Sequence, residues 1–344
     1  VRSSKFEVQG PELRTQNPGP MIIMRILIKT TFLLTALVLT SCEYGAKTEI
    51  EGAVDLPLTP YVVVLGIAQD AGYPQANCKK DCCAEAWENP QERRHASCIA
   101  LVDPRNGKRW LFEATPNMKL QLKQLDHFSE PHASVVDGIF LTHAHIGHYI
   151  GLIHLGREVI GGSGVPVYAM PRMRSFLREN GPWSQLVKLN NIALQKLNAD
   201  SSAVLESDLS ITPIQVPHRD EFSETVGFII RGSEKSVLFL PDIDKWVKWN
   251  RPIEDVLAMV DVAYLDATFY ANGEIPGRDM ALIPHPFVEE SMARFVNLPD
   301  TEKRKIRFIH MNHTNPMLQP ESEARKAVLN AGYGIAEEGE IVEL

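Results

Sequence analysis

Three histidines stand close together at the end of an apolar run. The stretch LTHAHIGHYIGL, residues 141–152, carries His143, His145 and His148. The segment before it, VDGIFLT, is typical of a strand, and residues two apart at a strand end point to the same face. His148 follows about one turn later, where the chain is expected to enter a helix. Three imidazoles that converge on one small volume suit Zn²⁺ or a similar borderline metal, so this stretch predicts a metal site.

A catalytic metal site needs further ligands, and each is expected just beyond another strand. Three residues of ligand type stand there: His218 after ITPIQVP, Asp242 after SVLFLP, and His313 at the end of RFIHMNH. His310 lies inside that last segment and is interpreted as a histidine packed within the strand. His285 follows the irregular loop NGEIPGRDMA, and long polar loops often cover a site. We therefore predict that His285 contacts the substrate or acts as an acid.

Two carboxylates lie near these positions without a clear ligand signal. Asp70 ends the first expected strand, and it either lines the site or caps its own loop. Asp244 follows Asp242 by two residues and is interpreted as a carboxylate on a loop surface.

Four cysteines lie close together before the histidine stretch. The segment NCKKDCC, residues 77–83, has the C-x3-C spacing of metal ligands. The candidate ligands of a structural metal are Cys78, Cys82, Cys83 and Cys98. Disulfides between these cysteines stay equally open if the protein is exported, and buried free thiols are a third alternative.

The elements that must position these residues are mostly strands. Apolar or alternating runs bounded by turn residues predict strands at 61–70, 97–103, 108–114, 136–142, 165–169, 209–217, 225–232, 235–242, 260–268 and 306–313. Helical patterns fall at 116–128, 149–161, 171–180, 253–259, 286–296 and 321–331. Strands and helices neither alternate strictly nor separate into an all-β chain. This order favours a sandwich of two mixed sheets with helices on the outer faces.

The N-terminal part of the chain is not expected to belong to that fold. Residues 1–20 are polar and without period, and the following stretch MIIMRILIKTTFLLTALVLTSC has basic, then apolar, then small residues. That is the order of a secretory signal, and its apolar run is too short to span a bilayer. We interpret residues 1–42 as a non-native leader followed by a signal peptide, 43–60 as a tether, and 61–344 as one domain.

The end of this signal favours a lipid anchor. LTSC resembles a bacterial lipobox, which implies that Cys42 is lipidated after cleavage and becomes the mature N-terminus. The alternative is an ordinary cleaved signal that leaves Cys42 free. The lipobox implies a protein held on the periplasmic side of a bacterial cell envelope, with the membrane contacted through the lipid alone.

The charge balance restricts the partners. The chain has 344 residues and a formal net charge of −8, which lacks the basic footprint of a nucleic-acid-binding protein. We predict a small-molecule substrate and no nucleic acid. The composition gives no basis for an oligomeric state.

The ordered set of histidines and aspartate resembles the metallo-β-lactamase superfamily across most of residues 61–344. The resemblance implies an αββα sandwich, two mixed sheets packed face to face with helices outside, and a metal site at one edge. It also implies roles for the residues at matching positions. A first metal would be held by His143, His145 and His218, a second would be served by His148 and His313, and Asp242 would bridge both.

Gly147 departs from the superfamily pattern, His-x-His-x-Asp-His, in which that position is an aspartate ligand of the second metal. Three readings are open: a single-metal enzyme, a water or substrate oxygen in place of the carboxylate, or an inactive site. One metal with three histidines and an open position already lowers the pKa of a bound water to about 7. We therefore expect one or two zinc ions, with iron as an alternative.

A narrower resemblance connects the chain to the coenzyme PQQ synthesis protein B family, in which nearby cysteines bind structural zinc. Its opening loop is similar to VLGIAQDAGYPQANCKKDCC, through Gly72, Pro74, Gln75, Asn77 and Cys78. LFEATPNMKLQL and HMNHTNPML resemble later stretches of that family. The family typically has Asp, Gln, Asp and Asn at the positions of His143, His145, Gly147 and His313, so this site is richer in histidine.

These observations lead to a functional prediction. We predict a metal-dependent hydrolase of an ester-like bond, a phosphodiester, lactone, thioester or amide, that uses a metal-bound hydroxide in the cell envelope. Asp242, His148 and His285 are the predicted catalytic residues. The alternatives are an iron-dependent oxidative enzyme related to the synthesis protein and a binding protein with a degenerate site.

Overall fold

The computed structural model describes residues 56–129 and 135–344. The leader, the signal peptide with Cys42, and the tether as far as residue 55 lie outside the described residues. None of the helices in the described ranges is both long and apolar enough to cross a membrane.

The first sheet contains seven strands in the order β14-β1-β2-β3-β4-β5-β6. Its strands are β1 (Tyr61–Gly66), β2 (Cys98–Asp103), β3 (Lys108–Phe112), β4 (Gly138–Phe140), β5 (Val165–Ala169), β6 (Ile192–Lys196) and β14 (Ile341–Glu343). The β1 to β3 segment is an antiparallel meander, and β3, β4, β5 and β6 run parallel. The expected hairpin at 97–114 is therefore confirmed as β2 and β3.

The second sheet also contains seven strands, in the order β13-β12-β11-β10-β9-β8-β7. They are β7 (Ala203–Glu206), β8 (Leu209–Val216), β9 (Thr225–Arg231), β10 (Ser236–Leu240), β11 (Val262–Asp266), β12 (Ile306–Ile309) and β13 (Gly334–Ile335). Strands β10 to β13 are parallel, and β7 to β10 are antiparallel. The short strands β6, β7, β13 and β14 were not expected, because runs of two to five residues carry little periodic signal.

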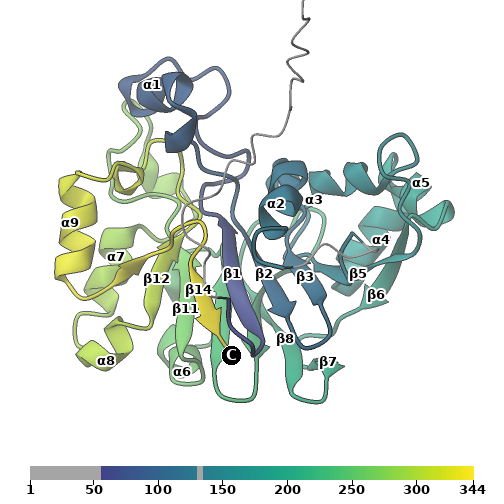
Figure 1. Cartoon of the computed structure of the whole chain (residues 1–344). Coiled ribbons are helices and arrows are strands. Elements are labelled where there is room, and N and C mark those ends of the chain that lie inside the picture. Colours follow the sequence, from purple (N-terminus) through teal and green to yellow (C-terminus); the bar gives the residue numbers. More distant parts are fainter. Residues whose placement is uncertain (1–55, 130–134) are drawn as a thin grey trace, which may run out of the picture. The chain divides into compact units, whose positions relative to one another are not determined.

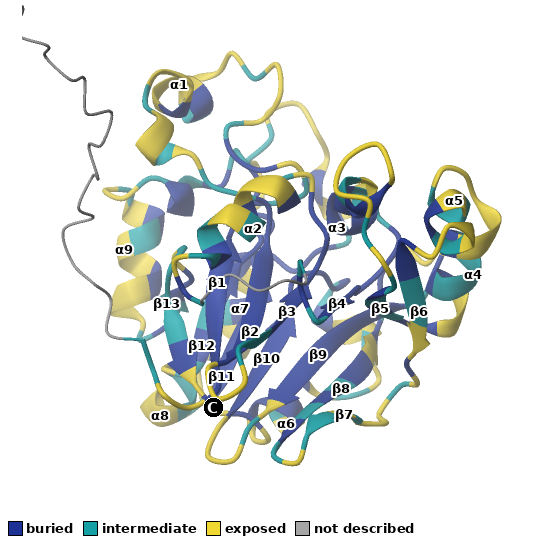
Figure 2. Cartoon of the chain, turned by 45° about the vertical axis from the view of Figure 1, so that its right-hand side comes forward, coloured by how far each residue is buried: buried dark blue, intermediate teal, exposed yellow. Residues whose placement is uncertain are grey.

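Helices cover the outer faces of the two sheets (Figure 1). Beside the first sheet lie α2 (Met118–Leu125), α3 (Ile146–Tyr149), α4 (Pro171–Glu179) and α5 (Trp183–Lys188). Beside the second lie α6 (Ile253–Leu257), α7 (Val288–Arg294), α8 (Asp300–Lys303) and α9 (Glu323–Asn330). Figure 2 shows buried strands inside and exposed helix faces outside. The molecule has the αββα sandwich of the metallo-β-lactamase fold, as the sequence predicts.

Two local expectations differ from the structure. The expected helix at 149–161 is instead a short 3₁₀ segment, Ile150–Leu155, that directly follows α3. Gly156 ends it, and turns follow up to Gly162. The loop of NCKKDCC leads into a helix that was not expected, α1 (Asp81–Glu88), which buries Cys83 and Ala86.

The core between the sheets is built from apolar side chains that both sheets contribute. A cluster of four aromatic rings lies at its centre. Phe112 and Phe140 stack with ring centroids 5.0 Å apart. Phe228, from the opposite sheet, meets Phe112 edge-on at 5.5 Å and Phe140 at 5.7 Å, and Phe239 lies 6.5 Å from Phe112. These rings hold the two sheets in one arrangement, and so fix the edge at which the predicted ligands meet.

A half-buried carboxyl away from this core makes stability depend on pH. Burial raises the pKa of Glu338 from 4.5 to about 7, although the backbone N–H of His95 and the charge of Arg94 lower it. Because the folded pKa lies above the unfolded one, the neutral carboxyl favours the folded state. Its contribution is complete below pH 4.5 and is lost as the pH rises through about 7.

We therefore expect Glu338→Gln to flatten the dependence of stability on pH. Between about pH 5 and pH 8, the free energy of unfolding of the wild type should fall by about 1–2 kcal/mol relative to the variant. Urea unfolding at both pH values measures this difference. Glu321→Gln, at a side chain that is 93% exposed, is the control and should track the wild type. A Glu338→Gln variant that also tracked the wild type would contradict the prediction.

Candidate metal centre

The ends of several strands meet at one edge of the sandwich. Strand β9 is antiparallel to both β8 and β10, so β8 and β10 run in the same direction. Strand β2 is likewise antiparallel to both β1 and β3, so β1 and β3 run in the same direction. The carboxyl ends of parallel strands lie at the same edge of a sheet. The candidate ligands all follow such ends: His143 and His145 after β4, His218 after β8, Asp242 after β10, and His310 after β12.

Hydrogen bonds hold the ligand loops at this edge, two of them between the sheets and one within the second sheet. The backbone N–H of Val226 donates to the carbonyl of Thr142 at 3.2 Å, and the N–H of Ala144 donates to Ser223 Oγ at 2.8 Å. The N–H of Asp244 donates to the carbonyl of Pro217 at 2.7 Å. The ligand loops are therefore fixed before any ion binds.

Asp242 is the point on which the histidines converge. Its carboxylate is buried, and four imidazole Nε2 atoms lie around its oxygens. The distances are 2.9 Å to His148, 3.6 Å to His143, 3.6 Å to His310 and 3.9 Å to His218. Burying one carboxylate and four imidazoles together is costly unless they are paired or bind an ion. This arrangement is therefore typical of metal ligands.

The outward nitrogen of each of these histidines faces an oxygen. Nδ1 lies 2.8 Å from Thr142 Oγ1 in His143, 3.2 Å from Asp244 Oδ1 in His218, 3.1 Å from Thr268 Oγ1 in His310, and 3.4 Å from Glu113 Oε1 in His148. The partners of His143, His218 and His310 set the tautomer and leave Nε2 free as an electron-pair donor toward the centre. Glu113 is close to His148 Nδ1 but is not aligned for a hydrogen bond. This second layer of Glu113, Asp244 and Thr268 was missed from the sequence. Asp244 is buried and not a surface carboxylate.

His145 has the opposite orientation. Its Nδ1 lies 2.8 Å from His143 Nε2, and its Nε2 faces Glu221 Oε2 at 3.1 Å. Ligand atoms of His143, His145 and His218 all lie within 4.8 Å of one another. The structure thus brings together the three residues expected to hold the first metal.

The placement of His313 is a correction. The prediction put His313 in this centre and His310 inside a strand, but β12 ends at Ile309 and His310 is the residue that enters the centre. His310 has a left-handed backbone, φ +67°, which turns the chain directly after the strand. A non-glycine residue with positive φ is uncommon, and the sequence run RFIHMNH gave no sign of this early turn. His313 lies next to Cys78 and Cys82 instead.

The residues present fit a metal such as zinc. Buried donor atoms without a hydrogen-bond partner among the described residues include both ring nitrogens of His148, Nε2 of His310 and Oδ1 of Asp242. His148 Nε2 is close to Asp242 but not aligned for a hydrogen bond. Imidazole and carboxylate are the donors that zinc takes. Unpartnered buried polar atoms are costly, and an ion at this point would satisfy them.

Burial and charge set the protonation of the ligands. Burial lowers the pKa of His143, His145 and His310, which keeps their lone pairs available for a cation. Burial raises the pKa of Asp242, but the surrounding His310, His148 and His218 outweigh it and hold this pKa well below its usual range. Asp242 is therefore an anion.

His285, the predicted substrate contact or acid, is buried beside Asp242. Its Nδ1 is 2.7 Å from Asp266 Oδ2 and 3.4 Å from Asp242 Oδ1. Asp266 is held by the N–H and hydroxyl of Thr268, at 2.9 Å and 2.7 Å. Burial lowers the pKa of His285, but Asp266 and Asp242 outweigh it and raise this pKa to about 9. Asp266, which ends β11, was not singled out from the sequence.

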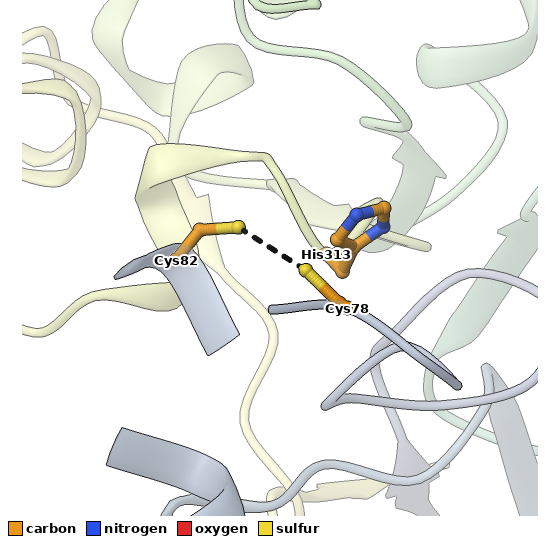
Figure 3. A group of neighbouring side chains, drawn as sticks. All are labelled: Cys78, Cys82 and His313. Atoms are coloured by element: carbon orange, nitrogen blue, oxygen red, sulfur yellow. Dashed lines mark hydrogen bonds between the residues drawn. The ribbon is translucent and has the colours of Figure 1, made fainter. Parts of the chain in front are cut away.

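A second group of metal-ligand type contains Cys78, Cys82 and His313 (Figure 3). The two sulfur atoms are 3.9 Å apart, and ligand atoms of all three residues lie within 4.8 Å of one another. Cys78 precedes α1, and Cys82 lies in its first turn. The four cysteines of the described residues are free thiols, so the disulfide alternative is not the state of this structure.

Cys98 does not belong to that group, which corrects its expected role as fourth ligand. It starts β2 and is fully buried, with Sγ 3.7 Å from the carbonyl oxygen of Ile99 and 4.0 Å from that of Glu113. Burial raises the pKa of its thiol well above the usual value. Cys83 lies on the buried face of α1, and burial raises its pKa to about 12.

We expect this cysteine group to hold a structural ion independently of the histidine centre. His313→Ala should lower the bound metal by one equivalent per chain, because a site with fewer ligands binds more weakly. Elemental mass spectrometry of the purified protein measures the loss. Cys98→Ala is the matched control and should keep the full metal content. An unchanged content in His313→Ala would show that the group holds no ion.

Comparisons with known proteins agree with this architecture. A family model described as the beta-lactamase superfamily domain matches residues 108–338. Coenzyme PQQ synthesis protein B of Methylorubrum extorquens (strain PA1) is 25% identical over 313 residues, 83% of this chain and 100% of the relative. The same protein of Xanthomonas axonopodis pv. citri (strain 306) is 26% identical over 302 residues, 81% and 98% of the two chains.

Solved structures share the fold over most of the chain. Zinc-bound PqqB from Methylobacterium extorquens has a TM-score of 0.68 at 23% identity and covers 83% of this chain and 100% of that one. A diphosphatase from the PhnP family has a TM-score of 0.58 at 21% identity, with coverage of 83% and 97%. Unliganded yeast PDE1 has a TM-score of 0.56 at 13% identity, with coverage of 84% and 100%.

Proposed function

This chain belongs to the beta-lactamase superfamily, and on that premise we propose that it is a metal-dependent hydrolase that cleaves an ester-like bond, with phosphodiesters as the favoured class. The observation that carries the proposal is the convergence of four buried imidazoles on the single carboxylate of Asp242. Such a donor set binds zinc and leaves part of the ion's surface for water and substrate.

The residues would divide the work as follows. His143, His145 and His218 would hold one ion, and Asp242 would lie beside it as an anionic ligand. A bound zinc ion supplies Lewis acidity and a water with a pKa near 7. Asp244, which touches His218 Nδ1, and Thr142, which touches His143 Nδ1, keep the imidazoles in the ligand tautomer.

The charges at the rim favour an anionic substrate. Arg219 Nη2 lies 3.4 Å from His145 Nδ1, and His285, paired with Asp266, is a cation with a pKa of about 9. Positive groups at two places around the centre attract an anion such as a phosphate ester. One of the similar solved structures is described as a diphosphatase, an enzyme that also acts on a phosphoryl group.

His285 is the proposed acid for the leaving group. Asp266 holds a proton on its Nδ1 at 2.7 Å, and the protonated ring can give a proton to the departing oxygen as the ester bond breaks. We expect His285→Ala to lower kcat roughly 100-fold for a phenyl phosphodiester. The loss for a p-nitrophenyl phosphodiester should be only about a few-fold, because that leaving group needs no proton.

Parallel assays of the two esters test this role. An equal loss on both esters would mean that His285 positions the site and does not donate the proton. The activity itself is tested with bis(p-nitrophenyl) phosphate, an aryl lactone and an aryl thioester, before and after EDTA. We expect the phosphodiester to react fastest and every activity to disappear with the metal. Activity that survives complete metal removal would contradict a metal-dependent hydrolase.

A second candidate is an iron-dependent oxidative enzyme. The likeness to coenzyme PQQ synthesis protein B, which spans the full length of the relative from strain PA1, favours it. Histidine and carboxylate ligands also suit iron. The two candidates differ in the ion recovered and in oxygen use: iron and oxygen consumption support the oxidative enzyme, and zinc with hydrolysis supports the first proposal.

We also propose that the protein acts on the periplasmic side of a bacterial cell envelope. The support is the leader sequence alone, which ends in LTSC with Cys42 as the lipidated residue. Mass spectrometry of the mature N-terminus tests it: a diacylglyceryl group on Cys42 supports the anchor, and an unmodified Cys42 overturns it.

A further inference from the structure

Asp70 lies at the metal centre although it comes from the far N-terminal end of the domain. It follows β1, in the loop that runs beside the chain after β12. The N–H of Gln69 donates to the carbonyl of Met311 at 2.8 Å, and the N–H of Met311 donates to the carbonyl of Ile67 at 2.9 Å. Since Met311 is the neighbour of His310, these bonds hold Asp70 next to a candidate ligand.

Gly147 leaves room for this aspartate. A Cβ atom at position 147 would lie 2.5 Å from Cα of Asp70 and 2.6 Å from its Oδ1. Real Cβ contacts are never this short, and the first atom belongs to the backbone, so no rotamer change relieves it. The space that a side chain at 147 would need is therefore filled by Asp70.

The Asp70 carboxylate reaches the same ligands that an aspartate at 147 would serve. Its Oδ1 is 3.7 Å from His148 Nε2, and ligand atoms of Asp70, His148 and His310 all lie within 4.8 Å of one another. Asp242 Oδ2 is 2.9 Å from His148 Nε2 and 3.6 Å from His310 Nε2. Ligand atoms of a tetrahedral zinc site with bonds of about 2.1 Å lie about 3.4 Å apart.

We propose that Asp70 supplies the carboxylate that position 147 lacks, and that Asp70, His148, His310 and Asp242 hold a second divalent cation. This inference rests on the proposed function, because it assumes a first ion on His143, His145 and His218. Two divalent ions bring four positive charges to the centre, and Asp242 alone offsets only one of them. Asp70 adds a second negative charge at the open end, where its side chain is 50% exposed.

Gly147 and Asp70 are therefore linked. The carboxylate ligand comes from the loop after β1 and not from the loop after β4, and Asp70 can occupy this position only because residue 147 is glycine. Gly147→Asp should not substitute for Asp70, because its Cβ would lie against the backbone Cα of residue 70 and displace the loop that carries Asp70.

The test is a titration of the metal-free protein with Zn²⁺, with tight equivalents counted against a competing chelator. Asp70→Asn keeps the shape of the side chain and suits the left-handed backbone at this residue, φ +44°, so a loop-capping role would survive it. We expect the wild type to bind two ions in the histidine centre. Asp70→Asn should weaken the second by about 100-fold or more.

Two further variants complete the experiment. Asp200→Asn is the matched control, an aspartate with φ +56° and an exposed side chain, and it should bind zinc as the wild type does. Gly147→Asp, whose Cβ would displace the loop that carries Asp70, should lose the second ion as Asp70→Asn does. Circular dichroism of each variant confirms that it is folded.

Each result separates this inference from the proposed function. Three tight ions in the wild type, one of them in the cysteine group, and two in Asp70→Asn support it. Equal numbers of tight ions in both proteins overturn it, and a wild type with a single ion in the histidine centre also overturns it; both leave a metal-dependent hydrolase standing. A wild type whose histidine centre binds no ion overturns the proposed function itself.

Discussion

Replacing Asp242 by alanine is expected to abolish metal binding in the histidine centre and to lower hydrolysis by about 10⁴-fold. The carboxylate faces His148, His143, His310 and His218 at once, at 2.9 to 3.9 Å. Without it, an ion in the centre would meet imidazoles alone and would lose its anionic ligand.

The measurement is metal content together with kcat/KM on bis(p-nitrophenyl) phosphate. Asp255→Ala, at an exposed aspartate of α6, is the control and should change neither quantity. If Asp242→Ala kept its metal and more than about a tenth of its activity, the centre described above would not be the active site.

Removing one ring from the core between the sheets is expected to have the largest effect on stability. Phe228 is fully buried and contacts Phe112 and Phe140 of the other sheet, at 5.5 Å and 5.7 Å between ring centroids. We expect Phe228→Ala to lower the free energy of unfolding by about 3–5 kcal/mol, because the lost burial adds to the cost of the cavity. Four aromatic rings packed together have little freedom to fill that space.

Urea unfolding of the metal-free protein measures this loss without interference from the ions. Phe222→Ala is the matched control, since Phe222 is 58% exposed and its ring meets only the neighbouring Phe176 among the described aromatic pairs. It should cost less than about 1 kcal/mol. Equal losses for Phe228→Ala and Phe222→Ala would show that the sheets are not held together by this cluster.

The parts of the fold that were predictable have strong local signals. Long apolar runs such as YVVVLG and SVLFL became the buried strands β1 and β10, and polar ligand types directly after such runs led to His218 and Asp242. Short edge strands such as β13 were not predictable, because their two residues pair only through tertiary contacts. Helix α1 was not predicted, because its cysteines were interpreted as metal ligands from their spacing and not as part of the buried face of a helix.

The errors in the candidate site have one physical origin. A sequence shows where a strand could end, but it does not show the backbone dihedral angles of the residue that ends the strand. The positive φ of His310 moves the turn three residues earlier than expected, so that His310 enters the centre and His313 joins Cys78 and Cys82. Asp70 and Gly147 are far apart in sequence, and their contact could be found only once β1 and β4 were placed in one sheet.

The residues that face the Nδ1 atoms of the histidines could not be predicted for a similar reason. Glu113, Asp244 and Thr268 each follow a different strand, and each touches one imidazole Nδ1. Nothing in their local sequence separates them from ordinary loop residues. Their role comes from the sheet order, which brings the ends of β3, β10 and β11 to the same edge.

The most direct test of the central claim is the metal content of the purified protein and of two variants, His143→Ala and Cys78→Ala. We predict that each variant loses metal from a different site: His143→Ala loses the histidine-centre metal and all hydrolysis, while Cys78→Ala keeps both. If His143→Ala retained the full metal content of the wild type, the histidine centre would hold no catalytic ion, and the proposed function would be wrong.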